Sequence, residues 1–143
     1  MRKRLVALLP LAAAAPVQPL EAARWDVTSK VVEFVAPGVP GFVARMIRGK
    51  SRAEHKRLSP GEGVESLLLP DPKAHCRVDS QSVSDGRYAQ TLTCPQKDGR
   101  PLRIDRSGTF NAGGFVGRAT VSGMTPKGAL RIVLDQRATR VGR

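Results

Sequence analysis

Turn-forming residues divide the second half of the chain into short segments at nearly regular intervals. Four clusters stand out, at Asp85-Gly86, 97–99, 111–114 and 126–128, and Asp or Asn next to Gly favours tight reversals between antiparallel strands. Between the clusters, apolar and polar residues alternate, as they do along 130–135. This alternation is typical of strands that bury one face. The pattern therefore predicts an antiparallel β-meander.

The expected strands cover most of the chain after residue 24. The first is rich in β-branched residues, and the others lie between the turn clusters. They run over 25–35, 75–83, 87–94, 102–105, 109–110, 115–121 and 130–135. The predicted fold is mainly β, an antiparallel meander in a strongly curved sheet or partial barrel, with one amphipathic helical excursion packed on it.

That helical excursion is expected at about 42–69. Phe42, Val43, Met46 and Ile47 fall on one helical face, and a second short helix is expected to start at the Ser59-Pro60-Gly61-Glu62 capping pattern. A domain of this size needs the apolar face of the first helix for its own core, so we expect this face to dock on the sheet. The alternative is that the helix lies on an anionic membrane surface.

The N-terminus has the pattern of a bacterial secretory signal peptide. Arg2, Lys3 and Arg4 precede an apolar stretch, 5–15, that is too short to span a bilayer. Small residues allow cleavage after Ala14 or after Ala22, and the second is favoured. We therefore expect a signal peptide over 1–22 and a single exported domain over 23–143, located in the periplasm or secreted.

Export determines how the two cysteines are interpreted. In an oxidising compartment the isolated pair, Cys76 and Cys94, is most simply a disulfide. The alternative is a metal site that adds His55 and His75, but no Cys-x-x-Cys or His-x-x-x-His spacing supports it. We expect neither a metal nor another cofactor.

Positive charge is the main functional signal. The formal net charge is +12, which favours anionic partners such as a membrane surface, lipopolysaccharide or an acidic envelope protein. The bland alternative is that the charge keeps a small exported domain soluble. Nucleic acid is not expected, because the aromatic residues are too dispersed to form a stacking platform. The expected anion-binding residues of this monomer are Arg45, Arg48, Lys50, Arg52, Lys56 and Arg57.

No catalytic constellation stands out in the sequence. There is no Gly-x-Ser-x-Gly motif, and His55 and His75 lie in basic or turn-like surroundings. Asp105 and Asp135 lie beside arginines on outward-facing strand positions, where surface pairing is expected. The predicted function is therefore that of a non-enzymatic binding module. The alternative is a barrel-like carrier that holds a small apolar ligand between sheet and helix.

Short motifs in a fixed order make the chain similar to a family of small exported bacterial proteins, known as domain of unknown function 3617. They include Trp25-Asp-Val-Thr-Ser-Lys30, Leu58-Ser-Pro-Gly-Glu62, Cys76, the Asp85-Gly86 turn leading to Leu92-Thr-Cys94, and Ala138-Thr-Arg-Val-Gly142. The resemblance implies export and a compact β-rich domain, and it implies no reaction.

The chain departs from this family at two positions. Family members commonly carry one cysteine just before the Leu-Ser/Thr-Pro-x-Glu element and another at the C-terminus, where this chain has Arg57 and Gly142-Arg143. If those two cysteines pair in the family, this chain lacks one complete bridge and retains the other. The resemblance thus supports the pairing of Cys76 with Cys94.

Overall fold

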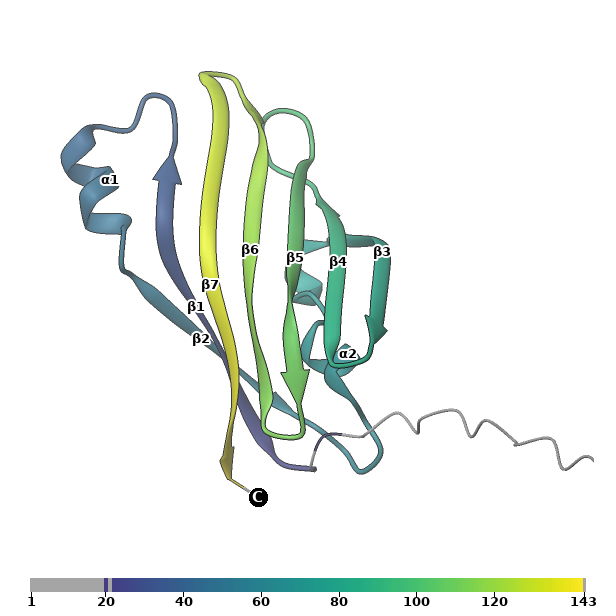
Figure 1. The fold of residues 1–143 in the computed structure, drawn as a ribbon. Coiled ribbons are helices and arrows are strands. Elements are labelled where there is room, and N and C mark those ends of the chain that lie inside the picture. Colours follow the sequence, from purple (N-terminus) through teal and green to yellow (C-terminus); the bar gives the residue numbers. More distant parts are fainter. Residues whose placement is uncertain (1–19, 21, 143) are drawn as a thin grey trace, which may run out of the picture.

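A computed structural model describes residues 20 and 22–142, which form one antiparallel sheet of seven strands (Figure 1). Neighbouring strands follow the order β2-β1-β7-β6-β5-β4-β3, and the sheet does not close into a barrel. The mainly β, antiparallel fold predicted from the sequence is confirmed. The strands are β1 (Arg24–Val35), β2 (Ser51–Arg57), β3 (Arg77–Ser84), β4 (Arg87–Cys94), β5 (Leu102–Asn111), β6 (Gly114–Thr125) and β7 (Gly128–Gly142).

The strands β3 to β7 form the predicted meander. At the β3–β4 turn, Asp85 has φ 51° and Gly86 has φ 73°. Positive φ at both central residues matches the right-handed twist of the flanking strands, which is why Asp-Gly is favoured there. The turns after β5 and β6 are also short, whereas a longer loop joins β4 to β5. Each turn cluster in the sequence thus separates two paired strands.

The first strand lies beside the last. β1 pairs with β7 from Arg24↔Gly142 to Val35↔Arg131, with an irregular register between Val31 and Glu33. β1 also pairs with β2 on its other side. The pairing of β1 with β7 thereby joins the N-terminal part of the domain to the C-terminal meander.

The predicted long helix is wrong in its second half. Helix α1 covers only Gly41–Ile47, and residues 51–57 form the edge strand β2. Gly49 has φ +82°, a left-handed conformation that ends a helix. Its amide donates to the carbonyl of Val31, and the amide of Val31 donates to the carbonyl of Lys50. These two bonds align the following residues with β1.

The hydrophobic core lies on one face of the sheet, here called the inner face, which is covered by α2 (Val64–Leu67) (Figure 1). Trp25 is fully buried, and Tyr88 and Phe115 meet edge to face with ring centroids 5.2 Å apart. The predicted capping pattern forms a turn before this helix, in which the amide of Ser59 donates to Glu62 over 2.9 Å, and the helix itself begins at Val64. A 3₁₀ turn over Pro72–Ala74 leads on to β3.

Candidate functional site

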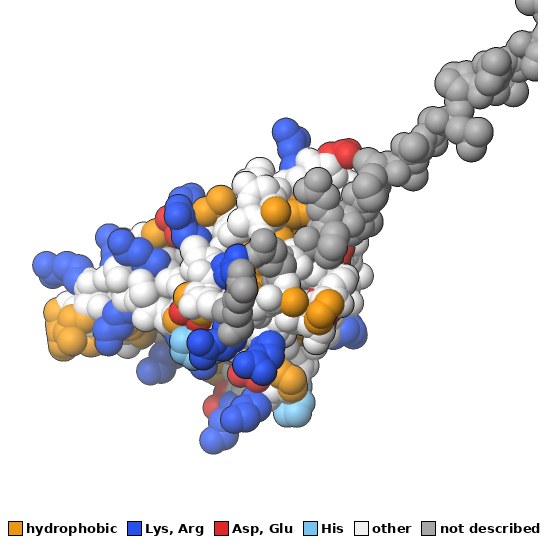
Figure 2. All heavy atoms as spheres, turned by 90° about the horizontal axis from the view of Figure 1, so that it is seen from below, with side chains coloured by type: hydrophobic (Ala, Val, Ile, Leu, Met, Phe, Trp, Pro, Cys, Tyr) orange, Lys and Arg blue, Asp and Glu red, His pale blue; other side chains and the backbone are white. Residues whose placement is uncertain are grey.

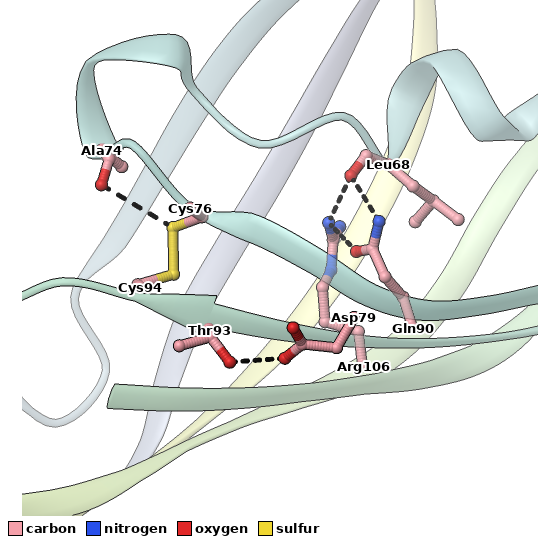
Figure 3. The surroundings of a disulfide bond; sticks show 8 residues. All are labelled: Leu68, Ala74, Cys76, Asp79, Gln90, Thr93, Cys94 and Arg106. Atoms are coloured by element: carbon pink, nitrogen blue, oxygen red, sulfur yellow. Dashed lines mark hydrogen bonds between the residues drawn. A yellow bond between two sulfur atoms is a disulfide. The ribbon is translucent and has the colours of Figure 1, made fainter. Parts of the chain in front are cut away.

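A disulfide joins Cys76, just before β3, to Cys94, the last residue of β4, with an S–S distance of 2.05 Å (Figure 3). The predicted pairing is confirmed. The bond closes the β3–β4 hairpin at the end opposite the Asp85-Gly86 turn. It also fixes the end of the segment that covers the inner face, because that segment leads directly into Cys76.

The six basic residues predicted to bind anions do not share one surface. Arg45 lies on α1, Arg48 and Lys50 follow it, and the other three lie on β2. Successive side chains of a strand point to opposite faces, so Arg57 faces away from Arg52 and Lys56. Five of the six are exposed, and Lys56 is not.

Lys56 contacts the end of α2. Its ammonium group donates to the carbonyl of Leu67 over 3.1 Å and to that of Leu69 over 2.5 Å. Burial lowers the pKa of Lys56, and the nearby Glu54 carboxylate, 3.9 Å from the ammonium, partly opposes this shift. The principal contacts of this lysine are therefore within the fold, to one carbonyl in the last turn of α2 and one just beyond the helix.

The α1 end of the molecule combines exposed apolar and basic side chains. Phe42 and Met46 are 65% and 63% exposed, so the predicted docking of this helix face on the sheet is wrong for both residues. The half-buried residues Val43 and Ile47 face the body of the protein instead. Figure 2 shows hydrophobic side chains gathered with Lys and Arg at the left end, where α1 lies in Figure 1. We call Phe42, Arg45, Met46, Arg48 and Lys50 the α1 patch.

A row of polar side chains crosses the inner face above the core, and sequence reasoning missed it. Arg106 donates from Nε to Gln136 over 2.9 Å and from Nη1 to Gln90 over 3.2 Å. Gln90 continues the row to Gln81 on β3 over 2.9 Å, and Gln136 continues it to Ser29 on β1 over 3.0 Å. The row thus connects five strands through side-chain hydrogen bonds.

Arg106 is the one cation of this polar row, and it is only 8% exposed. Its Nη1 also donates to the carbonyl of Leu68 over 3.1 Å, which Gln90 shares (Figure 3). Burial lowers the pKa of Arg106, with Tyr88 and Glu54 opposing the shift. Among the residues that the structure describes, no ion pair involves Arg106. Its hydrogen-bond partners are all neutral.

A cavity of about 140 Å³ lies between the polar row, the apolar residues next to it and the segment that follows α2. Leu67, Leu69 and Pro70 line it from that segment, and Lys56 and Glu54 line it from β2. Residues of six strands reach this one cavity, because the sheet curves around the segment. Its remaining lining from the sheet includes Val27, Ser29, Leu92, Ile104, Arg106, Ala119, Val121, Leu134 and Gln136.

The remaining candidate groups lie on the surface. His55 contacts Asp26 at 2.5 Å, but its side chain is 82% exposed. The expected surface pairing of Asp105 and Asp135 is confirmed, since Arg103 and Arg118 lie 2.9 and 3.0 Å from them. Over residues 20 and 22–142, no group of three or more His, Cys, Asp or Glu side chains could hold a metal ion. Within the same residues, no helix is long and apolar enough to cross a bilayer.

No protein-family model, curated protein or solved structure matches this chain.

Proposed function

We propose that this protein is an exported, non-enzymatic binding module that contacts an anionic membrane surface through its α1 patch. The observation that carries this proposal is the exposure of Phe42 and Met46 beside Arg45, Arg48 and Lys50. At a membrane surface, large apolar side chains can enter the boundary between lipid head groups and acyl chains, while neighbouring cations contact anionic head groups. Because Gly41–Ile47 is already helical, binding through Phe42 and Met46 does not require the ordering of a flexible segment.

The contributions of the α1 patch are comparable in size to the cost of association. Fully burying a Phe or Met side chain contributes roughly 1.5–3 kcal/mol, and each cation near an anionic surface contributes about 1 kcal/mol at physiological salt. Two apolar side chains and three cations can therefore offset much of the cost of association. The proposal predicts binding that weakens as salt increases, because exposed charges are screened.

The location in the periplasm, or outside the cell, is part of the same proposal. Its support is the leader-like pattern at the N-terminus, which lies almost wholly outside the described residues, together with the disulfide, a bond that persists in oxidising compartments. The resemblance to the exported family of unknown function agrees with it. Leu20 is buried, and its amide donates to the carbonyl of Glu62. In contrast to the sequence pattern, which favours cleavage after Ala22, this contact favours cleavage after Ala14, because that site leaves Leu20 in the mature chain.

Co-sedimentation with vesicles tests the proposal. The purified protein should bind vesicles that contain phosphatidylglycerol and should not bind vesicles of phosphatidylcholine alone. The triple variant Arg45→Gln/Arg48→Gln/Lys50→Gln should lose binding, and so should Phe42→Ser/Met46→Ser. The matched control Arg24→Gln/Arg87→Gln/Arg137→Gln removes the same charge from exposed residues outside the α1 patch. This control should retain most of the vesicle binding.

The opposite pattern of results would contradict the proposal. Equal losses in the two triple variants would mean that net charge, and not the α1 patch, attracts the protein. Binding to lipopolysaccharide or to an acidic envelope protein, with no affinity for phospholipid vesicles, would assign the patch to one of those partners instead.

A further inference from the structure

We propose that the inner face of the sheet binds a single-chain aliphatic carboxylate, with its head group at Arg106 and its chain along the neighbouring apolar residues. This site is separate from the α1 patch and does not depend on the membrane proposal. Three observations carry the inference: the cavity beside Arg106, the charge of its lining, and the open apolar surface next to it.

The charge of the lining favours a monoanion. Arg106 and Lys56 contribute two positive charges to the cavity, and Glu54 contributes one negative charge. One positive charge is therefore left in a site where Arg106 itself is nine-tenths buried. An unpaired buried charge is costly, and a single carboxylate would neutralise it. Two carboxylates and two cations would then occupy the site.

Arg106 retains donor capacity for such a ligand. A guanidinium group has five N–H donors, and the hydrogen bonds to Gln136, Gln90 and Leu68 use only Nε and Nη1. Nη2 donates to no residue in the described part of the chain. It is also not one of the buried unpartnered atoms there, so a ligand can reach it. The hydrogen bonds that an arginine donates to a carboxylate are among the strongest in proteins.

The apolar part of the site extends from Arg106 toward the loop between β4 and β5. Ile104, Val121 and Leu134 line the cavity and stay only half-buried. The register places Leu92, Ile104 and Val121 next to one another on β4, β5 and β6. From Arg106 to Leu102 the strand rises roughly 13 Å, at about 3.3 Å per residue.

The size of the cavity agrees with this arrangement. A cavity of about 140 Å³ holds only a few methylene groups, so the rest of an acyl chain would lie along the half-exposed apolar residues. Covering this surface would stabilise the complex by removing apolar area from water. A ligand with a branched or bulky head group would collide with the segment Leu67–Pro70 that lies over Arg106.

Calorimetric titration of the delipidated protein with dodecanoate tests the inference. Dodecanoate is used below its micelle concentration, with dodecanol and dodecylammonium as chain-matched probes. Dodecanoate should bind at least tenfold more tightly than dodecanol, because a hydrogen bond to a charged group is worth about 1.5–3 kcal/mol. Dodecylammonium should not bind detectably. This comparison needs no variant, so it does not depend on any substitution being tolerated.

Two variants and a control locate the site. Arg106→Gln should remove the preference for dodecanoate over dodecanol, and Val121→Trp should weaken both by filling the apolar surface. Arg103→Gln removes the same charge from the same strand on the opposite, exposed face and should bind dodecanoate like the native protein. Phe42→Ser/Met46→Ser, which tests the membrane proposal, should also leave dodecanoate binding unchanged.

Some results would overturn the inference. They are equal affinity for dodecanoate and dodecanol, a preference for dodecanoate that survives in Arg106→Gln, or the absence of binding by all three probes. Loss of dodecanoate binding in Arg103→Gln to the same extent as in Arg106→Gln would show a general charge effect, and it would equally exclude this site.

Discussion

Removal of the Cys76–Cys94 disulfide should reveal how weakly the edge strand β3 is otherwise held. The bond links residues 18 positions apart, and closing a loop of this length stabilises the fold by about 3 kcal/mol, mainly by restricting the unfolded chain. Of the eight residues of β3, only Val83 is even half-buried. The strand therefore gains little from apolar burial and depends on its ladder with β4 and on the disulfide.

Urea denaturation followed by Trp25 fluorescence measures this contribution, since Trp25 is fully buried in the core. The variant Cys76→Ser/Cys94→Ser should lose about 3 kcal/mol of unfolding free energy, and reduction of the native protein should give the same loss. Hydrogen exchange should show amides of β3 losing protection first, while β6 and β7, in the middle of the sheet, stay protected.

A loss of unfolding free energy below about 1 kcal/mol, a third of the loop-closure value, would contradict this prediction. The prediction would also be refuted if protection fell in β6 and β7 before β3. Either result would mean that the hairpin is held by contacts other than the bond and the ladder.

Four further predictions concern the core, the buried lysine and the N-terminus. Tyr88→Phe should raise the unfolding free energy by about 1 kcal/mol, because no described residue forms a hydrogen bond with the buried hydroxyl of Tyr88; a decrease in the unfolding free energy measured by thermal denaturation would contradict this. Gly117→Ala should lower stability by roughly 1–3 kcal/mol, because its Cβ would lie 2.1 Å from that same hydroxyl, and a variant as stable as the native protein would refute it. Burial lowers the pKa of Lys56 below 10.5, so the folded protein releases this proton at a lower pH than the unfolded chain does. The free energy of unfolding should therefore rise with pH between the folded pKa and 10.5. Unfolding experiments should show this rise as a growing difference in stability between the native protein and Lys56→Met. Intact mass of the exported protein should match cleavage after Ala14, whereas a chain that starts at Ala23 would show that Leu20 is dispensable to the core.

The local parts of the fold were predictable because their signals are local. Asp85-Gly86 determines both the turn type and the register of the two strands beside it, and the bond between Cys76 and Cys94 follows from the same hairpin. The pairing of β1 with β7 was not predictable, because no local pattern specifies which strands separated by a hundred residues lie side by side. Only the packing of the whole chain decides this.

The misread helix shows where two periodicities compete. Phe42, Val43, Met46 and Ile47 have helical spacing, and the structure retains a helix there. Beyond Gly49 the basic residues fit a helix and an edge strand equally well, because most of them stay exposed in the strand and would stay exposed in a helix. Two backbone hydrogen bonds select the strand: the Gly49 amide donates to the carbonyl of Val31, and the Val31 amide donates to the carbonyl of Lys50.

The polar row on the inner face is not predictable from any one strand of the sequence. Gln90, Arg106 and Gln136 each stand at an inward position next to an apolar one, Leu92, Ile104 or Leu134. Within one strand, such a polar residue only interrupts the alternation of apolar and polar positions. When three such polar residues lie next to one another across the sheet, they indicate a buried hydrogen-bond network. Only the register of the strands reveals that arrangement.

The most direct test of membrane contact by the α1 patch is the fluorescence of Phe42→Trp with vesicles that carry brominated phosphatidylglycerol. The native protein, in which Trp25 is fully buried, serves as the reference. The emission of the introduced tryptophan should shift to shorter wavelength and be quenched by the brominated chains, while the emission of Trp25 in the native protein should not change. A variant that binds these vesicles while the emission of its introduced tryptophan stays unshifted and unquenched would contradict membrane contact by the α1 patch.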